Sequence, residues 1–151
     1  PMLDELGLAS AVRWYARGLE KRAGLRVEVE GPERMPRYSE EIEGALFRVA
    51  QEALANVHRH SGSQKARIRI DCGADTVALE VSDSGRGIPS EHLEGAAEAP
   101  LGVGIPGMRL RLQQIGGCLK IESGASGTTV RAIVPAVPRA KEAAPSAKSA
   151  A

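Results

Sequence analysis

The sequence predicts a single α+β domain, a two-layer sandwich in which a mixed, mainly antiparallel sheet carries helices on one face. Some segments alternate polar and apolar residues with a period of two, as strands do, whereas others repeat apolar residues at intervals of three and four, as helices do. The segments do not follow the regular strand-helix alternation of parallel sheets. With 151 residues and 42% hydrophobic content, the chain has the size of one domain.

The first half of the chain predicts helix, strand and helix in turn. Apolar residues at helical spacing from Leu8 to about Ala23 predict the first helix, and Arg26–Glu30 alternates as a short strand does. Ser39 is predicted to cap a long amphipathic helix that reaches about His60. Its apolar positions lie three and four residues apart: Ile42, Leu46, Val49, Ala53 and Val57.

A hairpin and a connection follow this helix. Lys65–Cys72 and Thr76–Ser82 alternate with period two around a short turn, which predicts an antiparallel pair. A loop covers Asp83–Pro89. Ser90–Pro100 is rich in Glu, Ala and Gly and has no sustained period, so it predicts a mobile connection.

The last part of the chain predicts a helix and two strands. Pro106–Ile115 returns to helical spacing and is followed by two glycines. Cys118–Glu122 and Thr128–Val134 are predicted strands on either side of a glycine-rich turn. From Val137 onward the Ala, Pro, Lys and Ser residues offer little to bury, which predicts a disordered tail.

Composition excludes several classes of protein. Aromatic residues make up 3% of the chain and the net charge is +1, so we expect no nucleic-acid partner. No apolar run approaches the length of a membrane span. Cys72 and Cys118 lie in predicted strands, where we expect small buried thiols and a reducing, cytoplasmic setting. The opening Pro1-Met2 predicts a fragment of a longer protein, with any membrane anchor upstream.

Polar residues border the apolar face of the long helix. Glu52, Asn56 and His60 are four residues apart, and Arg59 lies close to Asn56 on the helix surface, so we expect one polar stripe directed into the cleft between helix and sheet. The alternative is an ordinary solvated helix face.

Two glycine-rich loops extend this pattern. Asp83–Gly87 follows a predicted buried strand, and Gly102–Gly107 opens a helix, whose free N–H groups suit phosphate. Either loop alone is also compatible with a plain turn. The second has the spacing of a dinucleotide-binding loop, with Glu122 twenty residues on, but it does not directly follow a strand. A Walker-type loop is absent from the sequence.

Four boxes in order resemble the GHKL ATPase superfamily, and specifically the catalytic domain of NarL/DesK-type sensor histidine kinases. The boxes are Gln51–Ser61, Val81–Ile88, Gly102–Arg109 and Gly127–Val130. Leu3–Leu8 is similar to the linker that follows the phosphoacceptor helices in this subfamily. The resemblance implies the Bergerat-type ATP-binding fold, with ATP and Mg²⁺ held between the long helix and a mobile lid.

The resemblance also implies roles for the polar stripe. Asn56 matches the magnesium ligand, a neutral oxygen that suits a hard cation already bound to phosphate and water. Arg59 and His60 would donate to the phosphates. Glu52 matches the carboxylate that activates water in hydrolytic relatives, and in a kinase it would orient or deprotonate the incoming histidine.

The two loops and the last strand receive the remaining roles. Asp83 resembles the buried carboxylate that accepts from the adenine amine, which favours ATP over GTP. Thr128 would support the adenine through its hydroxyl and water. The remaining nucleotide contacts lie beside the base and along the lid: Gly85, Gly87, Ile88, Gly102, Val103, Gly104, Gly107 and Met108. Two departures from the family pattern, Ser84 for Asn and Pro106 at the lid-side helix, remove no required group.

The resemblance assigns residues 1–8 to the linker, 9–136 to the catalytic domain and 137–151 to the tail. No segment resembles the phosphoacceptor helix, and His58, His60 and His92 do not fit that role. We therefore expect a monomer that binds ATP but needs the phosphoacceptor helices of its own protein for autophosphorylation, with a response regulator downstream. Two alternatives are an anti-sigma serine kinase and a nucleotide-dependent module without phosphotransfer.

Overall fold

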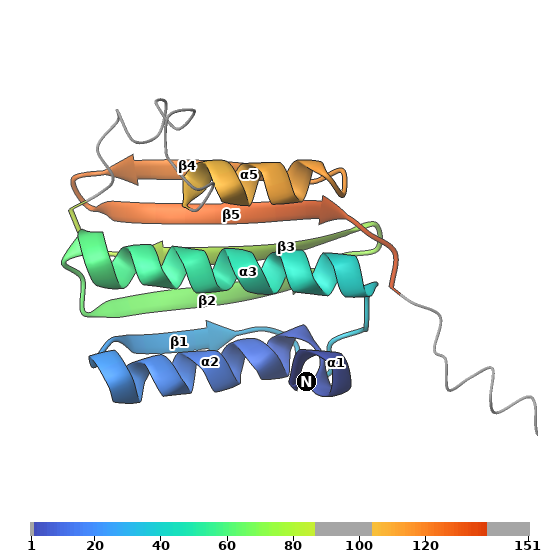
Figure 1. The fold of residues 1–151 in the computed structure, drawn as a ribbon, viewed down its shortest axis with the longest axis horizontal. Helices are drawn as coiled ribbons and strands as arrows, with labels where there is room; N and C mark the ends of the chain where they lie inside the picture. Colours follow the sequence, from blue (N-terminus) through green and yellow to red (C-terminus); the bar gives the residue numbers. More distant parts are fainter. Residues whose placement is uncertain (1, 87–103, 139–151) are drawn as a thin grey trace, which may run out of the picture.

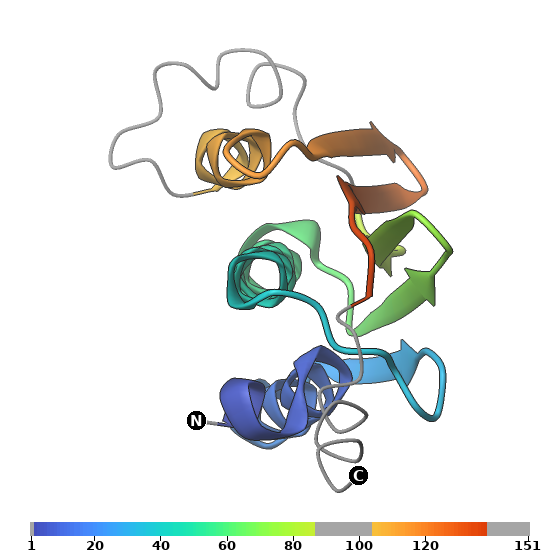
Figure 2. The same cartoon turned by 90° about the vertical axis from the view of Figure 1, so that its right-hand side faces the viewer.

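The structure, a computed structural model, describes residues 2–86 and 104–138. A five-stranded sheet carries its helices on one face (Figures 1 and 2). The strands are β1 (Arg26–Glu30), β2 (Lys65–Cys72), β3 (Thr76–Asp83), β4 (Cys118–Gly124) and β5 (Gly127–Pro135). The helices are α1 (Met2–Leu6), α2 (Leu8–Ala23), α3 (Glu40–Asn56), the π-helical turn η1 (Val57–Ser61) and α5 (Ile105–Gln113).

The sheet has the order β1-β2-β3-β5-β4, in which β1 is parallel to β2 and the other three pairs are antiparallel. The predicted mixed, mainly antiparallel sheet and two-layer sandwich are confirmed. Burial alternates along β2, so Ala66, Ile68 and Ile70 are buried while the residues between them are exposed. One face of the sheet therefore packs against helices.

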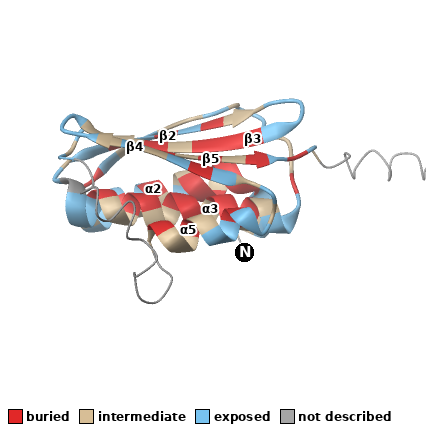
Figure 3. Cartoon of the chain, turned by 90° about the horizontal axis from the view of Figure 1, so that it is seen from above, coloured by how far each residue is buried: buried red, intermediate tan, exposed pale blue. Residues whose placement is uncertain are grey.

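The helical layer places α2, α3 and α5 side by side, with α3 in the middle (Figure 2). Buried residues gather between this layer and the sheet (Figure 3). Leu46, Val49 and Leu54 of α3 are fully buried, as are Ile68 and Leu79 of the sheet. The helix predicted to carry the site, α3, packs into this continuous apolar core.

The long helix begins as predicted and ends differently. The Ser39 hydroxyl caps α3 by accepting from the N–H of Ile42 at 3.3 Å. The helical path continues beyond Asn56, but η1 has the wider π-helical turn. The prediction that His60 continues the α-helical spacing of Glu52 and Asn56 is therefore wrong. Glu52 and Asn56 themselves lie in α3 and have that spacing.

The N-terminal segment folds against the body of the domain. The guanidinium of Arg37 donates to the carbonyl oxygens of Leu3 at 3.4 Å and Asp4 at 3.1 Å, and to both carboxylate oxygens of Glu43 at 3.0 Å. Residues 2–6 of the predicted linker thus form α1 and are tied to the first turn of α3. Leu8, predicted as the end of the linker, is the first residue of α2.

Both cysteines are free thiols, but the prediction that both are buried is wrong. Cys72 is half-buried at the end of β2, and burial raises the pKa of its thiol. Cys118 is exposed because it begins β4, an edge strand. The sequence alternation did not reveal which end of each strand lies under a helix.

The remaining elements agree with the predictions to within a few residues. The predicted connection 90–100 and residues 139–151 of the predicted tail lie outside the described residues. No helix within residues 2–86 or 104–138 is long and apolar enough to cross a membrane.

Candidate functional site

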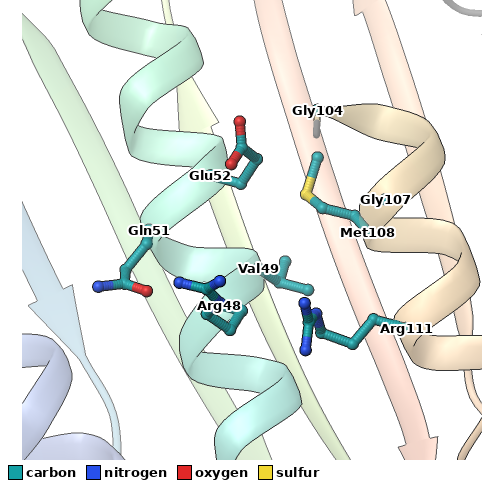
Figure 4. Close-up of a pocket in the computed structure, with 8 residues that line it drawn as sticks. All are labelled: Arg48, Val49, Gln51, Glu52, Gly104, Gly107, Met108 and Arg111. Carbon is teal, nitrogen blue, oxygen red and sulfur yellow. The ribbon is translucent and has the colours of Figure 1, made fainter. Parts of the chain in front are cut away.

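A cleft of about 260 Å³ lies between α3 and α5 (Figure 4). Both helices rest on the sheet, and the walls combine the buried Val49 and Met108 with more exposed side chains. Residues of α3 line one side, and Gly104 and α5 line the other: Arg48, Val49, Gln51, Glu52, Gly104, Gly107, Met108 and Arg111. The cleft that the sequence predicted lies between helix and sheet, and it stays a prediction beside this cleft between two helices.

Glu52 faces this cleft from α3, beside Gly104 and Met108 (Figure 4). Its side chain is 27% exposed and forms an ion pair with Arg59 at 3.6 Å. The Arg59 side chain also donates to the carbonyl of Ala55 at 3.4 Å. A carboxylate held by one exposed arginine keeps most of its acceptor positions available.

Asn56 and His60 lie further along the same path. Asn56 is half-buried in the last turn of α3 and His60 is exposed in η1. Neither lines the cleft. The carbonyl oxygen of His60 accepts from the Arg86 guanidinium at 3.0 Å. This contact brings the loop after β3 against the C-terminal end of the long helix.

Asp83 is the last residue of β3 and is half-buried, where the sequence predicted a buried carboxylate. Its Oδ1 accepts from the backbone N–H of Gly85 at 2.7 Å. The N–H of Ser84 donates to the Ser63 hydroxyl at 3.4 Å, which again joins this loop to the segment after η1. Among the described residues, only Oδ1 of Asp83 receives a donor.

The start of β5 lies directly against Asp83. Gly127 has a φ of 134°, and a Cβ placed there would come within 2.0 Å of the Asp83 carbonyl oxygen. The next residue, Thr128, is buried, and its hydroxyl hydrogen-bonds the Ser123 hydroxyl at 2.8 Å. Only glycine permits this approach of the two backbones. The sequence showed Gly127 within a glycine-rich turn but gave no sign of its neighbour.

The start of α5 closes the other side of the cleft. Gly104 has a φ of 82° and its carbonyl accepts from the N–H of Met108 at 3.0 Å. Among the described residues, no side chain caps this helix terminus. Met108 is buried and Gly107 lines the cleft. Gly87, Ile88, Gly102 and Val103 lie outside the described residues.

Sequence reasoning missed four of the residues that line the cleft: Arg48, Val49, Gln51 and Arg111. A helical signal was present for two of them. Arg48 precedes Glu52 by four residues and Arg111 follows Gly107 by four, so each shares a helix face with a predicted site residue. That these faces oppose one another required the packing of α5 beside α3.

Comparison with known proteins assigns the chain to a family. Residues 41–138 match the family described as histidine kinase-, DNA gyrase B-, and HSP90-like ATPases, so the chain belongs to this family and is an ATP-binding domain. The predicted GHKL relationship is confirmed.

The relatives at the sequence level are sensor histidine kinases. The chain is 31% identical over 134 residues to sensor histidine kinase MctS of Rhizobium johnstonii, with 89% of this chain and 29% of the relative covered. It is 30% identical to the kinase/phosphatase DegS of Brevibacillus brevis (88% and 33% covered) and 32% identical to the oxygen sensor NreB of Staphylococcus carnosus (88% and 38%). The chain therefore spans about a third of the length of these relatives. The NarL-type class predicted from the boxes is confirmed.

Solved structures agree on the fold. The histidine kinase domain of the blue-light activated kinase of Erythrobacter litoralis superposes with a TM-score of 0.69 at 23% identity, covering 85% of this chain and 64% of that one. The catalytic domain of histidine kinase ThkA superposes with a TM-score of 0.65 at 19% identity, covering 87% and 91%. At these identities the likeness concerns the fold alone.

Proposed function

We propose that this domain binds ATP with Mg²⁺ along the cleft between α3 and α5 and supplies the catalytic part of a sensor histidine kinase. The observation that carries the proposal is the placement of Glu52 opposite Gly104 and Gly107, with an uncapped helix terminus beside them. An uncapped helix start offers free N–H groups, which bind phosphate. A carboxylate on the facing helix is placed to act on a group that approaches that phosphate.

The base is proposed to bind at Asp83. Its Oδ1 is occupied by the Gly85 N–H, which leaves Oδ2 to accept from the exocyclic amine of adenine. Guanine has a carbonyl oxygen at the same place, and this acceptor cannot hydrogen-bond a carboxylate, so GTP should bind less well. The buried Thr128 hydroxyl lies on the neighbouring strand and supports the base through water.

The phosphates are proposed to bind between Asn56, Arg59 and His60 on one side and Gly104, Gly107 and the predicted lid on the other. No group of three or more His, Cys, Asp or Glu within the described ranges is arranged to hold a metal ion. Mg²⁺ in nucleotide sites needs few protein ligands, because phosphate oxygens and water supply the rest. The half-buried amide of Asn56 fits that role.

Phosphotransfer is proposed to use a histidine on helices outside these 151 residues. Glu52 would orient or deprotonate that histidine as it meets the γ-phosphate. The partners of the whole protein would then be its own phosphoacceptor helices and a response regulator, in the cytoplasm. This chain matches only about a third of the length of the sensor kinase relatives. We therefore propose that the phosphoacceptor helices belong to the part of the protein that corresponds to the rest of those relatives.

Calorimetric titration with adenylyl imidodiphosphate and Mg²⁺ tests the nucleotide site. The unchanged chain should bind this ATP analogue and not the GTP analogue, and Asp83→Asn should weaken binding about tenfold or more through loss of a charge-assisted hydrogen bond. Asp75→Asn, exposed in the turn before the same strand, is the matched control. Equal binding by Asp83→Asn would contradict the proposed adenine site.

A further inference from the structure

Two arginines stand at the end of the cleft away from Gly104. Arg48 comes from α3 and Arg111 from α5, so the two arginines line the cleft from opposite walls (Figure 4). Within residues 2–86 and 104–138, neither guanidinium forms an ion pair or a side-chain hydrogen bond. The nearby carboxylate of Glu52 is already paired with Arg59. Among residues 2–86 and 104–138, no carboxylate therefore pairs with the positive charge at this end of the cleft.

Uncompensated arginines in a cleft define the chemistry of a ligand. Two arginines that line the same cleft add positive charge to it, and an anion bound between them offsets that charge. Guanidinium groups match phosphate oxygens with paired N–H donors and stay charged at every physiological pH. The expected ligand is an anion with several oxygens.

The order of residues along α3 gives the direction of that ligand. Asp83, the proposed base site, lies against the C-terminal end of the long helix through the Arg86–His60 and Ser84–Ser63 contacts. Along α3, Glu52 lies between Asn56 and Arg48. Arg48 is one turn nearer the N-terminus than Glu52, which is about 6 Å along the helix axis. A nucleotide whose base binds at Asp83 would therefore direct its phosphate chain along α3 toward this end of the cleft.

We propose that Arg48 and Arg111 form a subsite for the terminal phosphate of a nucleoside triphosphate. The inference rests on the proposed function and adds to it the residues that distinguish ATP from ADP. It also explains how a terminal phosphate comes to lie near the Glu52 carboxylate, since two cations offset the repulsion between these negative groups. The arginines are positioned to hold the phosphate that is transferred.

The test compares triphosphate and diphosphate on the same variants. Adenylyl imidodiphosphate and ADP, each with Mg²⁺, are titrated into the unchanged chain, Arg48→Gln, Arg111→Gln and the double variant. Each single substitution should weaken binding of the triphosphate analogue about tenfold, which corresponds to one charge-assisted contact, and leave ADP binding within about twofold. The control for a general change of charge is Arg17→Gln. Arg17 is exposed on α2, which α3 separates from α5 (Figure 2), so this substitution should alter neither affinity.

Three results would overturn the inference. Equal losses for ADP and the triphosphate analogue would mean that the arginines act on the whole nucleotide. Unchanged affinities in all variants would mean that the pair faces a different anion, such as an acidic partner. If the unchanged chain bound neither nucleotide, the proposed function would itself fail. If the variants still bind ADP, they are folded and the nucleotide site is intact, so a failure of the arginine subsite can be told apart from a failure of the proposed function.

Discussion

The long helix α3 carries a glutamate near each end, and the two are held in opposite ways. Glu43, in the first turn, is 3% exposed and accepts from the Arg37 guanidinium and from the backbone N–H of Tyr38 at 3.0 Å. Glu52, nine residues later, is 27% exposed and has one ion pair at 3.6 Å. One carboxylate is enclosed by the protein's own donors, and the other faces a cleft.

The difference separates stability from ligand binding on a single element. A buried carboxylate needs all its donors from the protein, because removal from water is costly unless every oxygen is satisfied. Such a group joins α1 and α3 and offers nothing to a ligand. A half-exposed carboxylate with spare acceptor positions contributes little to stability but remains available for chemistry. Variants at the two ends should therefore have different effects.

The largest expected effect is on stability at the enclosed end. Glu43→Gln leaves the Arg37 guanidinium, whose side chain is 36% exposed, next to a neutral amide, and loss of these charge-assisted hydrogen bonds should lower the free energy of unfolding by about 2–3 kcal/mol. Urea unfolding measures this loss. Glu41→Gln, exposed in the same helical turn, should change stability by less than about 0.5 kcal/mol.

The same variant also tests the separation of roles. Below its unfolding transition, Glu43→Gln should bind the ATP analogue within about twofold of the unchanged chain, because the enclosed end does not contact the cleft. A large loss of affinity in the folded variant would show that the two ends of α3 are coupled.

The next effect concerns the backbone beneath the proposed base site. Gly127→Ala would place a methyl group 2.0 Å from the Asp83 carbonyl oxygen at a φ of 134°. The strain should cost about 2 kcal/mol of stability and displace Asp83, so the affinity for the ATP analogue should fall as well. Thermal unfolding and titration measure the two effects.

Gly124→Ala provides the matched control, because Gly124 lies in the same turn and a Cβ there meets no atom within 4 Å. This variant should keep both stability and affinity. Equal behaviour of the two alanine variants would remove the close approach of β5 to Asp83 as a requirement of the site.

The smallest effect is a difference in thiol reactivity with no change in stability. Cys72 lies at the enclosed end, where burial raises the pKa of its thiol and of the Tyr38 phenol, the latter to about 12. A raised thiol pKa lowers the fraction of reactive thiolate at pH 8. Iodoacetamide should therefore modify exposed Cys118 about tenfold faster than Cys72, as mass spectrometry would show. Equal rates would indicate that the enclosed end opens readily.

Local sequence determined most of the secondary structure. Three kinds of local feature were predicted: the hairpin of β2 and β3, the Ser39 cap, and the helical spacing of α2 and α3. Each of them depends on residues that are close to one another in the sequence. The four boxes also indicated the family, because their order and composition are specific. These features depend on neighbours in the chain, so a single sequence is sufficient to predict them.

Tertiary structure decided what the sequence left open. Arg37 contacts residues of α1 that are 33 and 34 positions away in the sequence. Gly127 approaches Asp83 because their strands, β5 and β3, are neighbours in the sheet. The same is true of the cleft, in which Arg48 and Arg111 become neighbours only because α5 packs beside α3. The periodicity of a segment reports which face is buried but not which other segment covers it, so long-range contacts require the folded chain.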